Sequence, residues 1–428
     1  MDVFQVSAAL LTLAALFSYT NHRLLKLPTT IGLMLIAMAS SLVLVAVGEL
    51  FPAVEARAQA YLAGIDFNKT VMQGMLGFLL FAAALHVNLA ELRKQRAVIG
   101  FLATAGVLMS TLMVGGMTYG LFTLMGVEVR LIYCLIFGAL ISPTDPIAVL
   151  AILKHVGAPK ALEMKIAGES LFNDGVAVVA FFGLIEIASG TGFDLPHLSL
   201  LFLQEAIGGA VYGFVLGAIT LLMLRRVDDY KVEVLLSLAT AAGGYALAYA
   251  LHVSGPIAMV VAGLYIGNEA RGGAMSEKTR EHLDDFWELM DEILNAVLFV
   301  LIGLELLIIS FSGLSLIAGL LAFPIVILAR FIAVALPVRL MRRRRVFTKG
   351  AIRILTWGGL RGGVSVALAL SIPSVVSGVP VAEREIVLSI TYVVVVVSIV
   401  AQGLTIGPLL RRTLAEATDD EPLIGGAA

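Results

Sequence analysis

Four polar residues at helical spacing interrupt an apolar stretch, Ile166 to Phe182, that reads IAGESLFNDGVAVVAFF. They are Glu169, Ser170, Asn173 and Asp174. Glu169 and Asn173 are spaced i, i+4, as are Ser170 and Asp174, so a helix places all four on one face. A charged side chain at bilayer depth costs about 2.5 kcal/mol or more unless it meets a partner, a cavity or a proton. This stripe is therefore a candidate functional site.

A second signal lies in the preceding apolar stretch, Ser142-Pro143-Thr144-Asp145-Pro146. Each proline lacks an N–H and crowds the carbonyl four residues back, which frees the oxygens of Ala139 and Ser142 from the helical ladder. Irregular backbone at membrane depth persists only where protein or a water-filled cavity satisfies it. The segment predicts a broken helix whose free carbonyls, beside a carboxylate, form a cation-sized cluster of oxygens.

A third signal is Trp357-Gly358-Gly359-Leu360-Arg361-Gly362-Gly363, in which four glycines surround one arginine. The glycines weaken the helix and let other backbones approach closely. A second interrupted helix is therefore expected here.

The elements that carry these motifs are membrane helices. With 59% hydrophobic residues, 14% charged residues and a mean hydropathy of +0.98, the chain has more apolar surface than a soluble domain of its length could bury. We predict an all-α polytopic membrane protein with about thirteen transmembrane helices. The predicted spans are Val3–Thr20, Pro28–Val47, Thr70–Leu89, Ala97–Met125, Leu131–Leu153, Ile166–Ala188, Leu200–Leu224, Glu233–Leu251, Gly255–Gly267, Glu292–Ser310, Leu314–Val338, Ala351–Ile372 and Glu385–Leu410.

The placement of Lys and Arg tests this division without using a motif. Of the 29 basic residues, 22 follow odd-numbered spans and only four follow even-numbered ones. The run Arg342 to Arg345 is among those that follow odd-numbered spans. Positive charge concentrates on the cytoplasmic side, so the amino terminus is expected outside and the carboxyl terminus in the cytoplasm.

The two interrupted helices fall in spans 5 and 12, which are seven spans apart, an odd number. Spans 1 to 6 and 8 to 13 would then cross the membrane in opposite senses, as two inverted six-helix repeats do in secondary transporters. We predict a transmembrane domain over residues 1–412. Repeat one covers about 3–188, a connecting helix about 200–224 and repeat two about 233–410, and residues 413–428 form a short cytoplasmic tail.

The motifs resemble a known family. SPTDPIAV at Ser142 to Val149, GESLFNDGVAVV at Gly168 to Val179, TWGGLRGGVSVALAL at Thr356 to Leu370 and VAQGLTIGPLL at Val400 to Leu410 resemble the signature segments of bacterial sodium/proton antiporters of the NhaP type. These belong to the cation/proton antiporter-1 family, which includes the animal sodium/proton exchangers. The resemblance covers essentially the whole membrane region, in the same order.

The resemblance implies roles for matching positions. Asp174 would alternately hold a proton or the cation, and Thr144, Asp145 and Ser170 would complete the site. Glu169 and Arg361 would form a structural ion pair between spans 6 and 12. Asn173, placed where electrogenic relatives carry an aspartate, implies electroneutral exchange of one cation for one proton.

The resemblance further implies a bacterial inner-membrane protein with a role in pH homeostasis, working by alternating access as a homodimer. Its partners would be the lipid bilayer, protons and Na⁺, with Li⁺ or K⁺ as other cargo. Many relatives carry a glutamate in the third span, where this chain reads LFAAAL, so a third acidic ligand is not assigned. The glycine face of Gly208, Gly209, Gly213 and Gly217 fits dimer contacts and contacts within one chain equally well.

Three alternatives stay open at this stage. A K⁺/H⁺ antiporter would use the same fold, and a passive channel would show flux without counter-flow. An intramembrane aspartyl protease could use Asp145 and Asp174, although its motifs differ. No phosphate-binding loop, metal-ligand cluster or haem motif is present, so we expect no cofactor, nucleotide or nucleic-acid partner. Asp291, Glu305 and Arg330 are expected to pair within the helix bundle.

Overall fold

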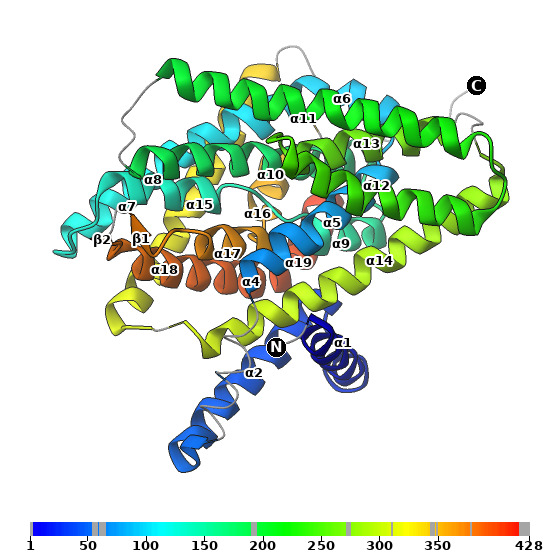
Figure 1. Cartoon of the computed structure of the whole chain (residues 1–428). Helices are drawn as coiled ribbons and strands as arrows, with labels where there is room; N and C mark the ends of the chain where they lie inside the picture. The colour runs from blue at the N-terminus through cyan, green and yellow to red at the C-terminus, as the bar shows by residue number, and fades with distance from the viewer. Residues whose placement is uncertain are drawn as a thin grey trace, which may run out of the picture.

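The computed structural model describes residues 3–53, 59, 66–189, 195–270, 275–309, 311–342, 347, 350–376 and 379–418. Within this part the regular secondary structure is helical apart from a small antiparallel ladder between β1 (Val375–Val376) and β2 (Val379–Pro380). The all-α prediction therefore holds except for these two short strands, and Figure 1 shows the arrangement.

The helices follow the predicted order. They are α1 Val3–Thr20, α2 Thr29–Leu50, α4 Phe67–Lys69, α5 Leu76–His86, α6 Leu89–Phe101, α7 Val107–Leu124, α8 Leu131–Ile141, α9 Ile147–Val156, α10 Lys160–Ala188, α11 Leu195–Leu224, α12 Tyr230–Ala250, α13 Gly255–Glu269, α14 Glu277–Leu304, α15 Gly313–Met341, α16 Ala351–Trp357, α17 Gly363–Leu370, α18 Glu383–Val397 and α19 Gly403–Thr418. Short π-helical turns occur at η1 (Asn21–Leu25), η2 (Thr70–Met75), η3 (Leu102–Gly106) and η6 (Ser398–Gln402), and η5 (Glu305–Leu307) is a 3₁₀ turn.

Local sequence signals set several helix starts. The Ser312 side chain accepts from the backbone of Ser315 while the Ser315 hydroxyl accepts from the backbone of Ser312, a capping box that begins α15. Three other helices have a simpler cap, in which one side-chain oxygen accepts from backbone N–H groups of the first turn. The capping residues are Asn88 for α6, Asp229 for α12 and Ser276 for α14. Such caps satisfy backbone N–H groups that the first helical turn leaves without partners.

Both predicted interruptions are present. Span 5 divides into α8 and α9 around residues 142–146, and span 12 divides into α16 and α17 around residues 358–362. Helix α19 continues to Thr418, past the predicted end of span 13 at Leu410 and into the predicted tail. Residues 419–428, and residues 343–345 of the basic run, lie outside the described part of the chain.

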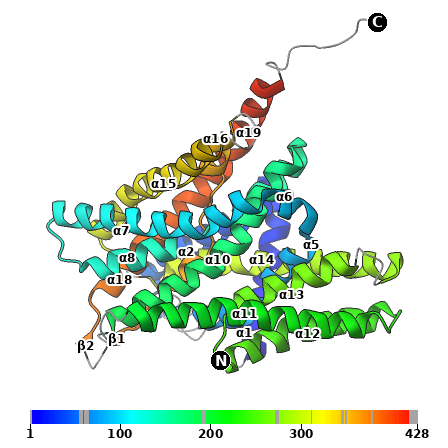
Figure 2. The same ribbon diagram turned by 90° about the horizontal axis from the view of Figure 1, so that it is seen from above.

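Helix α10 lies at the centre of the assembly. It packs against α8 and α6 on one side and against α11 and α13 on the other. Figure 2 shows α7 and α8 on one side of α10 and α11 on the other. Helix α14 packs against α2, α1 and α5, and Figure 1 shows α1 and α2 beyond α14 at the edge of the bundle.

The glycine face of α11 serves contacts within the chain. A Cβ atom on Gly213 would lie 2.3 Å from the backbone carbonyl oxygen of Ala258 in α13. A Cβ atom on Gly209 would lie 2.7 Å from the backbone carbonyl oxygen of Ser254. Side chains at these positions would hold the two helices apart, so glycine permits their close approach.

In the part of the chain that the structure describes, eight helical segments are long and apolar enough to cross a membrane. Large apolar side chains also cover exposed faces, as on α11 with Leu203, Ile207 and Val211. Apolar surface of this extent is stable in lipid. The chain is therefore a multi-pass membrane protein.

Candidate functional site

The two helix interruptions meet each other. The Asp145 N–H donates to the Leu360 carbonyl at 2.8 Å, and the two residues form an isolated antiparallel bridge. Gly362 makes this approach possible, because a Cβ atom there would lie 2.4 Å from the Asp145 Oδ2 atom. Some of the backbone hydrogen-bonding groups that each interruption leaves without a helical partner are thus satisfied by the other interruption.

Arg361 occupies the space that the proline break creates. Its Nη1 atom donates to the carbonyls of Ser142 at 2.7 Å and Pro143 at 2.9 Å, and its backbone N–H donates to the Ser398 hydroxyl at 3.0 Å. The Ser142 oxygen is one of the two that the prolines were predicted to free. The other, on Ala139, accepts a long bond of 3.4 Å from the Ser142 N–H.

Glu169 pairs with Arg330 of α15, so the predicted pair between Glu169 and Arg361 was wrong. Both nitrogens of the Arg330 fork reach the Glu169 carboxylate, with 3.0 Å between Nη2 and Oε2. Arg330 also donates to the Leu355 carbonyl at the end of α16. The reason for the difference is that Arg361 lies in unwound backbone and turns to the carbonyls freed beside it. Arg330 was predicted to pair within the bundle, and this prediction is confirmed.

Thr144, Ser170 and Asn173 form one buried polar cluster. The hydroxyl oxygens of Thr144 and Ser170 are 3.1 Å apart, and the Asn173 amide donates to the Thr144 hydroxyl at 2.9 Å. The Asn173 Oδ1 atom is buried and has no hydrogen-bond partner among the described residues. Helix α10 therefore contacts Thr144, in the interruption of span 5, through two side chains. These are Ser170 and Asn173, which lie about one helical turn apart on the predicted polar face.

Asp145 and Asp174 bring two carboxylates to this cluster. Asp145 Oδ1 accepts from the Ile147 N–H at 3.0 Å, which caps the start of α9. Asp174 follows Asn173 on α10, and its carboxylate interacts electrostatically with that of Asp145. Both aspartates keep some accessible surface, whereas Thr144, Ser170 and Asn173 are buried.

The structure therefore brings five predicted residues together and places Glu169 and Arg361 next to them. The cluster offers carboxylate, hydroxyl and amide oxygens, which are the ligands that hard cations prefer. The two buried guanidinium groups are held by other partners, Arg330 by Glu169 and Arg361 by backbone carbonyls. An arrangement of this kind can hold one small cation or a proton.

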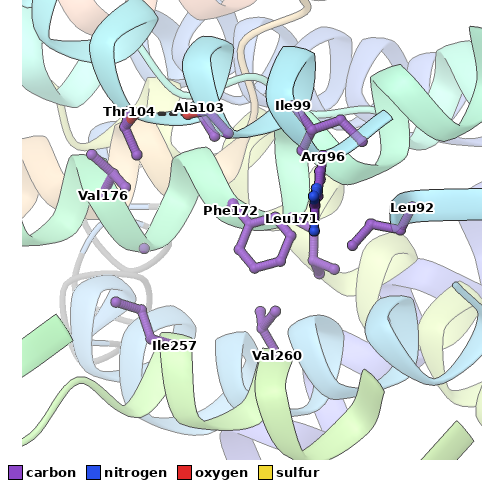
Figure 3. A pocket seen from close by; sticks show the side chains of 12 residues that line it. Leu92, Arg96, Ile99, Ala103, Thr104, Leu171, Phe172, Val176, Ile257 and Val260 are labelled. Carbon is purple, nitrogen blue, oxygen red and sulfur yellow. Dashed lines mark hydrogen bonds between the residues drawn. The ribbon is translucent and has the colours of Figure 1, made fainter. Parts of the chain in front are cut away.

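Two cavities border the helices of the site. One, of about 290 Å³, lies between α6, α10 and α13 and has an apolar lining. Figure 3 shows Phe172 and Val176 of α10 facing Ile257 and Val260 of α13 across it, with Arg96 at one side. The other, of about 880 Å³, lies between α1, the start of α2, α9, α14 and α19. It reaches Ile147, two residues after Asp145.

Known proteins resemble this chain along nearly its whole length. It is 52% identical to the Na⁺/H⁺ antiporter NhaP of Pseudomonas aeruginosa over 416 residues, which cover 95% of this chain and 96% of the relative. It is 36% identical to the Na⁺/H⁺ antiporter NhaH of Halobacillus dabanensis, with 96% and 98% covered. The solved structure of the sodium proton antiporter MjNhaP1 from Methanocaldococcus jannaschii at pH 8 superposes with a TM-score of 0.71 at 19% identity. The superposition covers 97% of this chain and 100% of that one, and it shows a common fold.

The family described as sodium/hydrogen exchanger, transmembrane, matches residues 11–412, which include both interruptions and the polar face of α10. Its members are transporters, so the chain is a transporter and not an enzyme. Matches to the family and to full-length relatives agree with the resemblance of the four signature segments. The chain belongs to the sodium/hydrogen exchanger family.

Proposed function

We propose that the protein exchanges sodium ions for protons across the bacterial inner membrane. The observation that carries the proposal is the buried cluster of Thr144, Ser170 and Asn173 at the crossing of the two interrupted helices, where Asp145 and Asp174 directly follow Thr144 and Asn173 in the chain. The names of the relatives, which are sodium/proton antiporters, support the choice of ions.

Asp174 is the group that alternately holds the proton or the cation. Asp145, Thr144 and Ser170 supply further oxygens to the bound ion, and Asn173 orients Thr144 through its 2.9 Å hydrogen bond. The buried, neutral Asn173 adds no charge to the cluster. This supports electroneutral exchange of one cation for one proton.

Exchange follows from the physics of a carboxylate away from bulk water. Burial makes the bare charged form costly, and either a proton or a cation relieves that cost. The two ions therefore compete for the same negative charge. Alternating access follows if the neutralised site crosses between the two sides readily while the bare carboxylate does not.

The wider architecture is part of the proposal. Thirteen membrane crossings, with the two interrupted helices in inverted repeats, are supported by the order of the helices along the chain and by the two interruptions in spans 5 and 12. The Lys and Arg distribution supports an external amino terminus and a cytoplasmic carboxyl terminus. By family likeness the active unit is a homodimer.

Dye-reported proton flux in everted membrane vesicles tests the proposal, with sodium, lithium and potassium added one at a time. We expect sodium to drive proton movement in the unaltered protein and Asp174→Asn to abolish it. Glu163→Gln, which removes a carboxylate from the first turn of the same helix, is the matched control and should retain exchange. Potassium-driven flux without a sodium response would favour the K⁺/H⁺ alternative, and normal exchange by Asp174→Asn would refute the assignment of the site.

A further inference from the structure

The larger cavity holds polar groups that the proposed exchange cycle does not use. Its walls are mainly apolar, with Leu11 and Ala14 from α1 and Ile152 from α9, and the charged residues Glu292 of α14 and Arg411 of α19 also line it. On α14, however, Asp291 and Asn295 line the same cavity. They are four residues apart on one helix and therefore share a face.

Asn295 is an unusual lining residue. Only 2% of its surface is exposed, and neither its side-chain nitrogen nor its oxygen makes a hydrogen bond of normal geometry with the described residues. A buried polar group without partners costs roughly 1–3 kcal/mol, so such groups call for an explanation. A ligand that enters the cavity and binds the amide oxygen would supply the missing partner.

Asp291 connects this position to the exchange site. Its carboxylate lies near the Asn295 amide and interacts electrostatically with Asp145, which in turn interacts with Asp174. His86, at the end of α5, also interacts electrostatically with it. The charge on Asp291, at the cavity, therefore acts on the carboxylate of Asp145.

We propose that Asp291 and Asn295 form a capture site for the transported monovalent cation, which the ion occupies before it reaches Asp145 and Asp174. The inference rests on the proposed exchange function and adds a second binding position to it. With the proposed orientation, this cavity lies on the cytoplasmic side, because α9, the first half of α14 and α19 lie there.

Two physical effects would favour a cation at this position, the electric field of the Asp291 carboxylate and the oxygen ligands of Asp291 and Asn295. Apolar walls around a negative charge focus its field and raise the local concentration of cations. The Asp291 carboxylate and the Asn295 amide oxygen replace part of the ion's hydration shell. Asp145 then draws the ion onward, since its carboxylate accepts from the N–H of Ile147, a residue that lines the cavity.

The test uses everted vesicles, in which the cytoplasmic face is outside, and measures proton flux against sodium concentration. For Asp291→Asn we expect the half-saturating sodium concentration to rise about tenfold, with the maximal rate at saturating sodium within about twofold of the unaltered protein. Asp291→Glu, which keeps the charge, should restore most of the affinity. Glu288→Gln, one turn earlier on α14 and outside the cavity lining, is the matched control and should change neither quantity.

The outcomes separate this inference from the proposed function. An unchanged half-saturating concentration in Asp291→Asn, or a lower maximal rate at an unchanged half-saturating concentration, would overturn the capture site. If Asp291→Asn does not assemble, Asn295→Leu removes the other ligand and must raise the half-saturating concentration. Exchange by Asp174→Asn would instead refute the proposed function, whatever the result at Asp291.

Discussion

Loss of the Glu169 carboxylate should destabilise the protein because it leaves a buried guanidinium without its counter-charge. Only 1% of the Glu169 side chain and 8% of the Arg330 side chain are exposed. Glu169→Gln leaves Arg330 with one neutral amide oxygen and the Leu355 carbonyl as acceptors, and with no counter-charge from residue 169. Breaking a buried ion pair in this way costs about 3–5 kcal/mol. A loss of about 4 kcal/mol lowers the ratio of folded to unfolded protein roughly a thousandfold.

A double-mutant cycle isolates the pair. Arg330→Met alone strands the Glu169 carboxylate, whereas Glu169→Gln with Arg330→Met strands no charge and leaves neutral groups unpaired, namely the introduced amide and the Leu355 carbonyl. The double variant should therefore lose about 1–3 kcal/mol, and the coupling energy should exceed about 2 kcal/mol. The four proteins of the cycle are the unaltered protein, the two single variants and the double variant. Their stabilities are compared by heating the detergent-purified proteins and measuring by size-exclusion chromatography how much folded protein remains.

The matched control is the cycle between Glu169→Gln and Arg361→Met. Arg361 donates to backbone carbonyls, so its coupling to Glu169 should be much smaller than that of Arg330. A larger coupling with Arg361 would refute the assignment and restore the pair that the sequence resemblance implies. Wild-type stability of Glu169→Gln would refute the reasoning about buried charge.

Two further substitutions test the crossing of the interrupted helices. Gly362→Ala would place a Cβ atom 2.4 Å from the Asp145 carboxylate, so we expect loss of exchange in everted vesicles, whereas Gly116→Ala in α7, with nothing within 4 Å, should retain it. Asn173→Ala removes a hydrogen bond to Thr144 worth about 1 kcal/mol. The half-saturating sodium concentration should then rise roughly fivefold, and an unchanged value would contradict a role for Asn173 in orienting Thr144.

The features that the sequence predicted well are local ones. Pro143 and Pro146 break the helix through their own chemistry, and the glycines around Arg361 weaken it in the same local way. The polar face of α10 follows from helical periodicity alone. These arguments need no knowledge of which helices are neighbours, and the structure has both interruptions at the predicted positions.

The pairings between distant helices could not be predicted in this way. Arg330 is 161 residues from Glu169, and three arginines, Arg330, Arg353 and Arg361, lie within predicted spans. No periodicity distinguishes them as partners. Asp291 was missed as a lining residue for a similar reason. It directly precedes the predicted span that begins at Glu292, whereas α14 is continuous from Glu277 and carries it into the cavity.

The pH dependence of sodium affinity tests the central claim most directly. If a proton and a sodium ion compete for Asp174, the half-saturating sodium concentration in everted vesicles should rise on acidification by up to about tenfold per pH unit. The maximal rate at saturating sodium should change little over the same range. A half-saturating concentration that is independent of pH, with only the maximal rate changing, would mean that the two ions use separate groups, and would contradict the account.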